Sequence, residues 1–133
     1  MHLILISCGK LKTSFPTEAR HLYQGSLFKK SYRYAEQLHG TIMILSAKHH
    51  LVSTTEVLRP YNLTLKQMSQ KERLHWADVT SAQINNLQPD TITYLAGIEY
   101  YKHLPAGHAP LGNLPLGKRL QWLDQHTERK GFL

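Results

Sequence analysis

Residues 41–51 read TIMILSAKHHL, and this stretch decides the predicted fold class. Residues 41–45 are apolar or β-branched, a pattern typical of a strand that is buried on both faces of a sheet. Two small residues follow, and then one cation and two imidazoles. Because α/β proteins place reactive groups where parallel strands end, this exit is a candidate functional site. The same residues also fit a solvated surface loop.

Two further apolar runs, residues 2–7 and 91–96, predict strands of the same kind. Helical patterns lie between and after the strands, over residues 17–23, 27–39, 65–87 (with a break near Ser69), 98–103 and 116–128. Thr17 and Ser26 are the expected caps of the first two helices, and Gly40 is the expected stop of the second. One more edge strand is expected within residues 52–58 or 109–114. Parallel strands joined by right-handed helical crossovers predict a small three-layer α/β/α sandwich with a mostly parallel sheet of three to four strands.

The composition indicates one soluble domain over residues 1–133, since 41% of the residues are hydrophobic and 19% are charged. No apolar run approaches the roughly 18 residues of a membrane span. The first residues lack the basic region and cleavage site of a signal peptide. The single cysteine excludes an intramolecular disulfide, so we expect a cytoplasmic protein that does not contact a membrane.

The chain is basic, with 16 Lys and Arg against 9 Asp and Glu and a formal net charge of +7. Such an excess favours polyanionic or phosphate-bearing partners through steering and counterion release. The basic face of the helix at residues 27–39 and the basic C-terminal tail, which we expect to be frayed, can serve a nucleic acid or a dimer. The oligomeric state therefore stays open.

The three predicted strands end at the same edge of the sheet, and each is followed by polar or small residues. Gathered at that edge, these residues would give a thiol, an imidazole, a carboxylate, two ammonium groups and glycines that allow close backbone approach. The residues are Ser7, Cys8, Gly9 and Lys10 after the first strand, Ser46, Lys48 and His49 after the second, and Gly97, Glu99 and Tyr100 after the third.

Several of these side chains are candidates for catalysis or binding. Cys8 is either a nucleophile activated by nearby cations or a small residue packed at a strand end. Lys10 and Lys48 suit a phosphate or an anionic base edge, and are otherwise solvated lysines. His49 or Glu99 can act as a general base, although Glu99 also fits an ordinary first-turn helix acid.

Two aromatic residues, Tyr23 and Tyr61, are candidates for stacking on a nucleobase beside these cations, and Tyr61 fits core packing equally well. His49 and His50 are adjacent and should point apart in an extended chain, so at most one faces the site. No metal-ligand spacing, dinucleotide fingerprint, phosphate-binding P-loop or nucleophile elbow occurs in the sequence. We therefore predict neither a metal nor a cofactor.

The chain carries motifs of a known family. They are Cys8-Gly9-Lys10, Ala19-Arg20-His21-Leu22-Tyr23, Leu27-Phe28, Leu45-Ser46-Ala47-Lys48-His49, Pro60-Tyr61 and Pro115-Leu116-Gly117. Together they resemble domain of unknown function 6884, found in bacteria and phages, over nearly the whole chain. More distantly, the pattern is similar to the YaaA-type superfamily and to a domain of archaeosine synthase.

The resemblance implies an enzymatic activity directed at a nucleobase, of the N-glycosidase or base-modification type. The reaction would be either transfer at a modified base or cleavage from one. The resemblance implies that the functional residues are Cys8, Lys10, Tyr23, Ser46, Lys48, His49 and Tyr61. At His50 the family has glycine, and a positive φ there would place this histidine in a strained turn. The alternatives are a non-catalytic protein that sequesters a nucleotide or DNA, as a phage-encoded protein would, and a small interaction domain with a basic surface.

Overall fold

A four-stranded sheet forms the centre of the molecule, in the order β4-β3-β1-β6. The computed structural model describes residues 1–128. Strands β1 (His2–Ser7), β3 (Thr41–Ser46) and β6 (Thr91–Leu95) are parallel, and β4 (His50–Ser53) runs antiparallel along the outer side of β3. The predicted mostly parallel sheet is confirmed.

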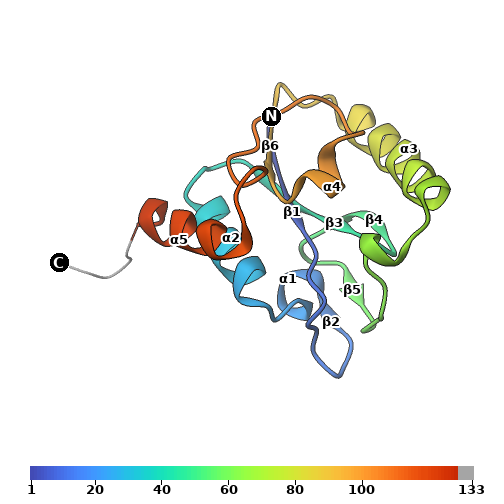
Figure 1. Ribbon diagram of the computed structural model, residues 1–133, viewed down its shortest axis with the longest axis horizontal. Coiled ribbons are helices and arrows are strands. Elements are labelled where there is room, and N and C mark those ends of the chain that lie inside the picture. Colours follow the sequence, from blue (N-terminus) through green and yellow to red (C-terminus); the bar gives the residue numbers. More distant parts are fainter. Residues whose placement is uncertain (129–133) are drawn as a thin grey trace.

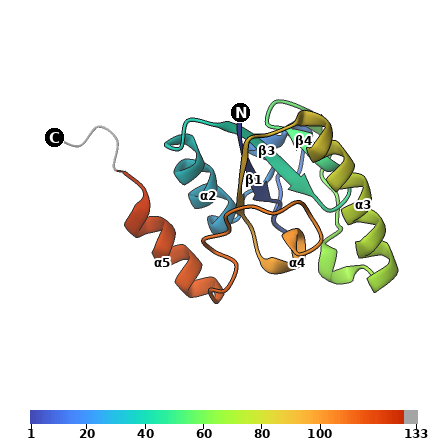
Figure 2. The same ribbon diagram turned by 90° about the horizontal axis from the view of Figure 1, so that it is seen from above.

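Helices cover both faces of this sheet (Figures 1 and 2). Helices α2 (Ser26–Glu36) and α5 (Leu116–His126) pack together on one side, and α3 (Gln70–Leu87) lies on the other beside β4. Two short helices, α1 (Ala19–Leu22) and α4 (Ile98–Tyr101), precede α2 and follow β6. The arrangement is the small α/β sandwich that the sequence predicts.

Strand β1 is central because its residues 3–6 are apolar on both faces and are at most 1% exposed. Strand β3 is buried only in its second half: Thr41 is exposed, whereas Ile44 and Leu45 are fully buried. The expectation of a strand buried throughout residues 41–45 is thus wrong for its first half. Ile6 pairs with Ile44 on one side and with Leu95 on the other, so the three parallel strands end level with one another.

A second, two-stranded sheet joins β2 (Thr17–Glu18) to β5 (Val57–Leu58). Thr17 therefore pairs with a strand and does not cap a helix. The edge strand expected at residues 52–58 is split, because a turn separates β4 from β5. Residues 109–114 form no strand; instead His108 makes a single parallel bridge to Thr93 beside β6.

The ends of α2 differ from the prediction. The N-cap is Gly25, with Ser26 already helical, and the helix ends at Glu36, three residues before His39. His39 adopts the left-handed conformation at φ 54°. Gly40 is required for a different reason, since a Cβ atom there would lie 2.5 Å from the carbonyl oxygen of His2.

Helix α3 begins after the predicted break. A 3₁₀ turn, η1 (Leu65–Gln67), precedes Ser69, whose hydroxyl accepts from the backbone N–H of Glu72 at 3.1 Å. The Glu72 carboxylate in turn accepts from the N–H of Ser69 at 2.9 Å, which completes a capping box. No helix within residues 1–128 is long and apolar enough to cross a membrane. The tail that was expected to be frayed, residues 129–133, lies outside the described residues.

Candidate functional site

A cavity of about 660 Å³ lies where β1 and β6 end, and we call it the edge cavity. Its walls also include the 3₁₀ turn η1 and the start of α5. Residues from the first and third predicted exits line it together, and the level ends of β1 and β6 allow this. The predicted site residues that it gathers are Ser7, Cys8, Lys10, Gly97, Glu99 and Tyr100.

A buried contact in the edge cavity joins Cys8 to Tyr100. The Cys8 Sγ lies 3.4 Å from the Tyr100 hydroxyl, and the two residues are 7% and 9% exposed. The backbone N–H of Cys8 donates to the carbonyl oxygen of Leu45 at 2.9 Å, which extends the β1–β3 pairing to the strand exit. Burial, and then the nearby Cys8, raise the pKa of Tyr100 well above its ordinary value. Tyr100 therefore presents a protonated hydroxyl.

Glu99 brings a carboxylate to the same cavity from the first turn of α4. Its side chain folds back over Gly97, where a Cβ atom would lie only 2.6 Å from Oε2. Gly97 thus leaves room for the carboxylate between the end of β6 and the start of the helix. Glu99 is half-buried, so the carboxylate stays accessible to a ligand.

Three cations line the edge cavity, and only Lys10 is predicted by the sequence. The other two are Lys66, on the 3₁₀ turn η1, and Arg119, in the first turns of α5. The Arg119 Nε donates to the carbonyl oxygen of Leu114 at 2.7 Å, which fixes the guanidinium. Neither residue stands near a predicted strand exit, so no local sequence signal marks them.

A chain of hydrogen bonds runs beside the edge cavity. The Tyr61 hydroxyl lies 2.6 Å from the Tyr23 hydroxyl and 2.7 Å from the Ser46 Oγ. Ser46 is fully buried, and its Oγ also accepts from the backbone N–H of His49 at 3.0 Å. Burial raises the pKa of Tyr23 to about 12 and raises that of Tyr61 further. These three predicted residues are thus brought together as an uncharged network.

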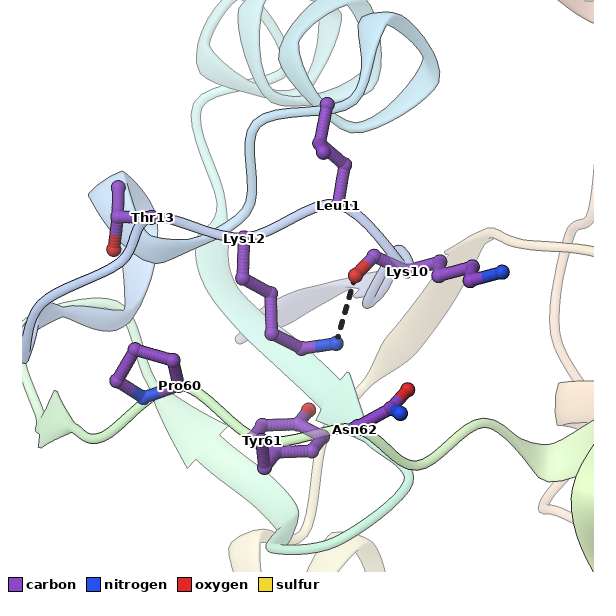
Figure 3. A pocket seen from close by; sticks show the side chains of 7 residues that line it. All are labelled: Lys10, Leu11, Lys12, Thr13, Pro60, Tyr61 and Asn62. Atoms are coloured by element: carbon purple, nitrogen blue, oxygen red, sulfur yellow. Dashed lines mark hydrogen bonds between the residues drawn. The ribbon is translucent and has the colours of Figure 1, made fainter.

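A second cavity of about 600 Å³, the loop cavity, lies between residues 10–13 and residues 60–62 (Figure 3). It shares Lys10 with the edge cavity. Figure 3 shows the Lys12 side chain between the two segments, above the Tyr61 ring. The Lys12 Nζ lies 4.3 Å from the centroid of that ring, a cation–π distance.

Lys12, two residues after Lys10 in the segment that follows β1, is a further functional candidate. Its Nζ donates to the carbonyl oxygens of Gly9 at 3.0 Å and Lys10 at 3.2 Å. Burial lowers the pKa of Lys12, while the nearby Cys8 opposes that shift. The ammonium therefore fixes the backbone of the loop after β1, including the position of Gly9.

The predicted residues Lys48 and His49 lie beside Tyr61 and line neither the edge cavity nor the loop cavity. The Lys48 side chain is exposed, with its Nζ 5.9 Å from the Tyr61 ring centroid. The His49 ring meets the same ring edge-on at 5.3 Å. Burial, and then the Lys48 charge, lower the pKa of His49. The cleft expected to be shared by all three strand exits therefore does not include Lys48 and His49.

His50 contacts a different aromatic residue than His49 does. Its ring stacks on that of Trp76 at 6.5 Å, and the Trp76 Nε1 donates to the carbonyl oxygen of Ser46 at 2.8 Å. His50 has φ 64°, the left-handed conformation that glycine adopts readily. The β3–β4 turn therefore accepts histidine with a glycine-like backbone.

No three His, Cys, Asp or Glu side chains within residues 1–128 cluster closely enough to hold a metal ion. Against known proteins, the model of the family of unknown function DUF6884 matches residues 3–125. The chain therefore belongs to this family. No curated protein matches it.

Proposed function

We propose that this DUF6884 protein is an enzyme that acts on the base of a nucleotide or nucleic acid, by cleaving the glycosidic bond or by modifying the base. The observation that carries the proposal is the composition of the edge cavity. One carboxylate, one protonated phenol in contact with a thiol, and three cations line a space of about 660 Å³. A volume of this size suits a ligand as large as a nucleotide.

Binding follows from the charges around the edge cavity. The cavity is lined by three cations, Lys10, Lys66 and Arg119, and Glu99 is the single acid among the described lining residues. The cavity therefore favours an anion. The Arg119 guanidinium, fixed by its bond to Leu114, suits bidentate contact with phosphate oxygens. The phosphate of a nucleotide would occupy this side of the cavity.

Glu99 is the group we assign to acid–base chemistry. In a hydrolytic glycosidic cleavage, its carboxylate takes a proton from a water molecule as the water oxygen bonds to C1′. The bond from C1′ to the base nitrogen breaks, and the departing base takes up the proton from Glu99, which returns the carboxylate to its starting form. The Tyr100 hydroxyl, held protonated by burial, can donate a hydrogen bond to a ring acceptor of that base.

Cys8 and His49 are the other two catalytic candidates, and they differ in position. Cys8 lines the edge cavity with Glu99, so it stays a candidate nucleophile. His49 lies against Tyr61 and outside the described lining of that cavity. We therefore assign catalysis to Cys8 and Glu99 before His49.

A second candidate function is non-catalytic binding of the same ligand. It is favoured by the packing of the Glu99 carboxylate onto Gly97 and by the contact of the Cys8 thiol with Tyr100, because both groups already have structural partners. In that case the three cations would hold a nucleotide without turnover.

Turnover separates the two functions. The protein is incubated with nucleotides and oligonucleotides, including modified bases, and the products are resolved by chromatography. An enzyme loses at least about a hundredfold in rate in Glu99→Gln while it keeps nucleotide affinity. Asp78→Asn, at an exposed position of α3, is the matched control and should act as the wild type. Equal rates in Glu99→Gln and wild type would remove Glu99 from the chemistry, and binding without any product would favour the second function.

A further inference from the structure

Three cavities follow one another along the surface. The third, about 450 Å³, lies between α1 and α2, and we call it the helix cavity. The edge and loop cavities share Lys10, and the loop and helix cavities meet at the hydrogen-bonded pair Tyr61 and Tyr23. The backbone of residues 11–13 also pairs with that of residues 22–24, so these paired segments link the linings of the last two cavities.

The charges along this series are strongly one-sided. Seven of the sixteen Lys and Arg residues line the three cavities, against two of the nine acids, Glu99 and Glu36. The helix cavity contributes three of the seven cations, Arg20, Lys29 and Arg33; Arg20 is already ion-paired with Glu18, whereas the other two are not paired within the described residues. A cationic track this long suits a ligand with a repeated negative charge better than one with a single phosphate.

Helix α2 presents its charges on two separate faces. Lys30 pairs with Asp124 of α5, so that face is committed to packing within the protein. Lys29 and Arg33, four residues apart, share the face that lines the helix cavity. Within residues 1–128 neither side chain has an ion-pair or hydrogen-bond partner, so both are available to a ligand.

Aromatic rings alternate with these cations. Tyr61 lines the loop cavity, and Tyr32 lines the helix cavity between Lys29 and Arg33 in sequence. Both residues are half-buried, and because the Lys12 Nζ already lies over the Tyr61 ring, Tyr32 is the clearer platform for a base. A cationic groove with aromatic platforms is the usual surface for single-stranded nucleic acid, because the backbone follows the cations and the bases stack on the rings.

We propose that the edge, loop and helix cavities bind successive nucleotides of one single strand, so the substrate is a polynucleotide and not a free nucleotide. This inference rests on the proposed function, since the nucleotide in the edge cavity is the one acted on. A single strand fits because its bases are free to enter separate cavities, whereas a duplex keeps them paired.

The test compares affinities for nucleoside monophosphates, single-stranded DNA, single-stranded RNA and duplex DNA of the same sequence. The informative variant is Lys29→Gln with Arg33→Gln, and Lys71→Gln with Lys102→Gln is the control that removes two exposed cations outside the three cavities. We expect single strands to bind at least tenfold more tightly than monophosphates. The first double variant should lose most of that gain and lower the salt slope by about 0.7 per lost contact, with monophosphate affinity unchanged.

The outcomes separate this inference from the function on which it rests. Single strands that bind no better than monophosphates, or equal losses in the two double variants, would overturn the polynucleotide track and leave the edge cavity standing. Duplex affinity equal to single-strand affinity would overturn the single-strand assignment. No binding of any monophosphate or strand would overturn both proposals. The comparison of single-stranded DNA with single-stranded RNA identifies which of the two polymers is the substrate.

Discussion

The thiol of Cys8 lies 3.4 Å from the hydroxyl of Tyr100, so the ends of β1 and β6 meet at a direct contact between residues 92 positions apart. This contact sits in the cavity that also holds Glu99 and three cations. It depends on the parallel pairing of the two strands, which brings both exits to the same edge of the sheet. The candidate site is thus a consequence of the topology.

Cys8 should react slowly with thiol reagents in the native protein, because only 7% of the residue is exposed. Since the chain has a single cysteine, the rate of alkylation reports on Cys8 alone. We expect the rate to rise strongly in denaturant and to fall further when a nucleotide fills the edge cavity. A native rate equal to the denatured rate would contradict the observed burial.

Tyr61→Phe should lower the free energy of unfolding by about 1–3 kcal/mol, because it leaves the buried hydroxyls of Tyr23 and Ser46 without their shared partner. Tyr32→Phe is the matched control: its hydroxyl has no hydrogen bond within residues 1–128, and the change should stay within about 0.5 kcal/mol. Urea unfolding of both variants measures the difference. Equal effects would mean that the hydroxyl network contributes little to stability.

Strands usually prefer valine to glycine, and the left-handed backbone at His50 should reverse this preference. At φ 64°, His50→Val should be less stable than His50→Gly by about 1–2 kcal/mol, because a β-branched side chain clashes in this conformation. At Ser53, in the same strand, valine should instead be more stable than glycine. Thermal unfolding of the four variants tests this, and the same order at both positions would argue against the positive φ.

Stability should fall on acidification through the titration of His49 and His50. Burial lowers the pKa of both imidazoles from the ordinary value of 6.5, helped by Lys48 at His49 and by His75 at His50. As the pH falls below about 6.5, the two histidines bind protons in the unfolded state but stay neutral in the folded state. The free energy of unfolding therefore decreases until the pH reaches the lower pKa values of the folded state.

The measurement for these histidines is Tm as a function of pH. His49→Asn with His50→Asn should flatten the decrease between pH 7.5 and the folded pKa values, and asparagine tolerates the backbone at position 50. His103→Asn, at an exposed position, is the control. The effect should be small because both rings are partly solvated. A steeper acid loss in the double variant than in wild type would reverse the sign and contradict the account.

The fold was largely predictable because its three parallel strands are apolar runs that do not depend on their neighbours for recognition. The errors lie where tertiary contacts decide the local structure. Thr17 looks like a helix cap, but its pairing with Leu58 places it in a strand. Gly40 looks like a helix stop, but its role is to let the chain pass the carbonyl oxygen of His2.

The candidate site was predictable only where it follows strand exits. Cys8, Glu99 and Tyr100 were found because residues at the ends of β1 and β6 must share an edge. Lys66 and Arg119 come from a 3₁₀ turn and a helix, and only the packing of those elements brings them to the cavity. His49 was misplaced because a strand exit fixes the edge, but not the direction in which a side chain turns.

The most direct test of the central claim is thermal unfolding of the protein with a panel of nucleoside monophosphates. If the edge cavity binds them, Tm rises with nucleotide concentration in the wild type and in the Lys71→Gln, Lys102→Gln control. The rise should be lost, or need far more nucleotide, in Lys10→Gln with Lys66→Gln, which removes two cations from the cavity. Equal shifts in both double variants, or no shift with any nucleotide, would contradict a nucleotide site at the edge of this sheet.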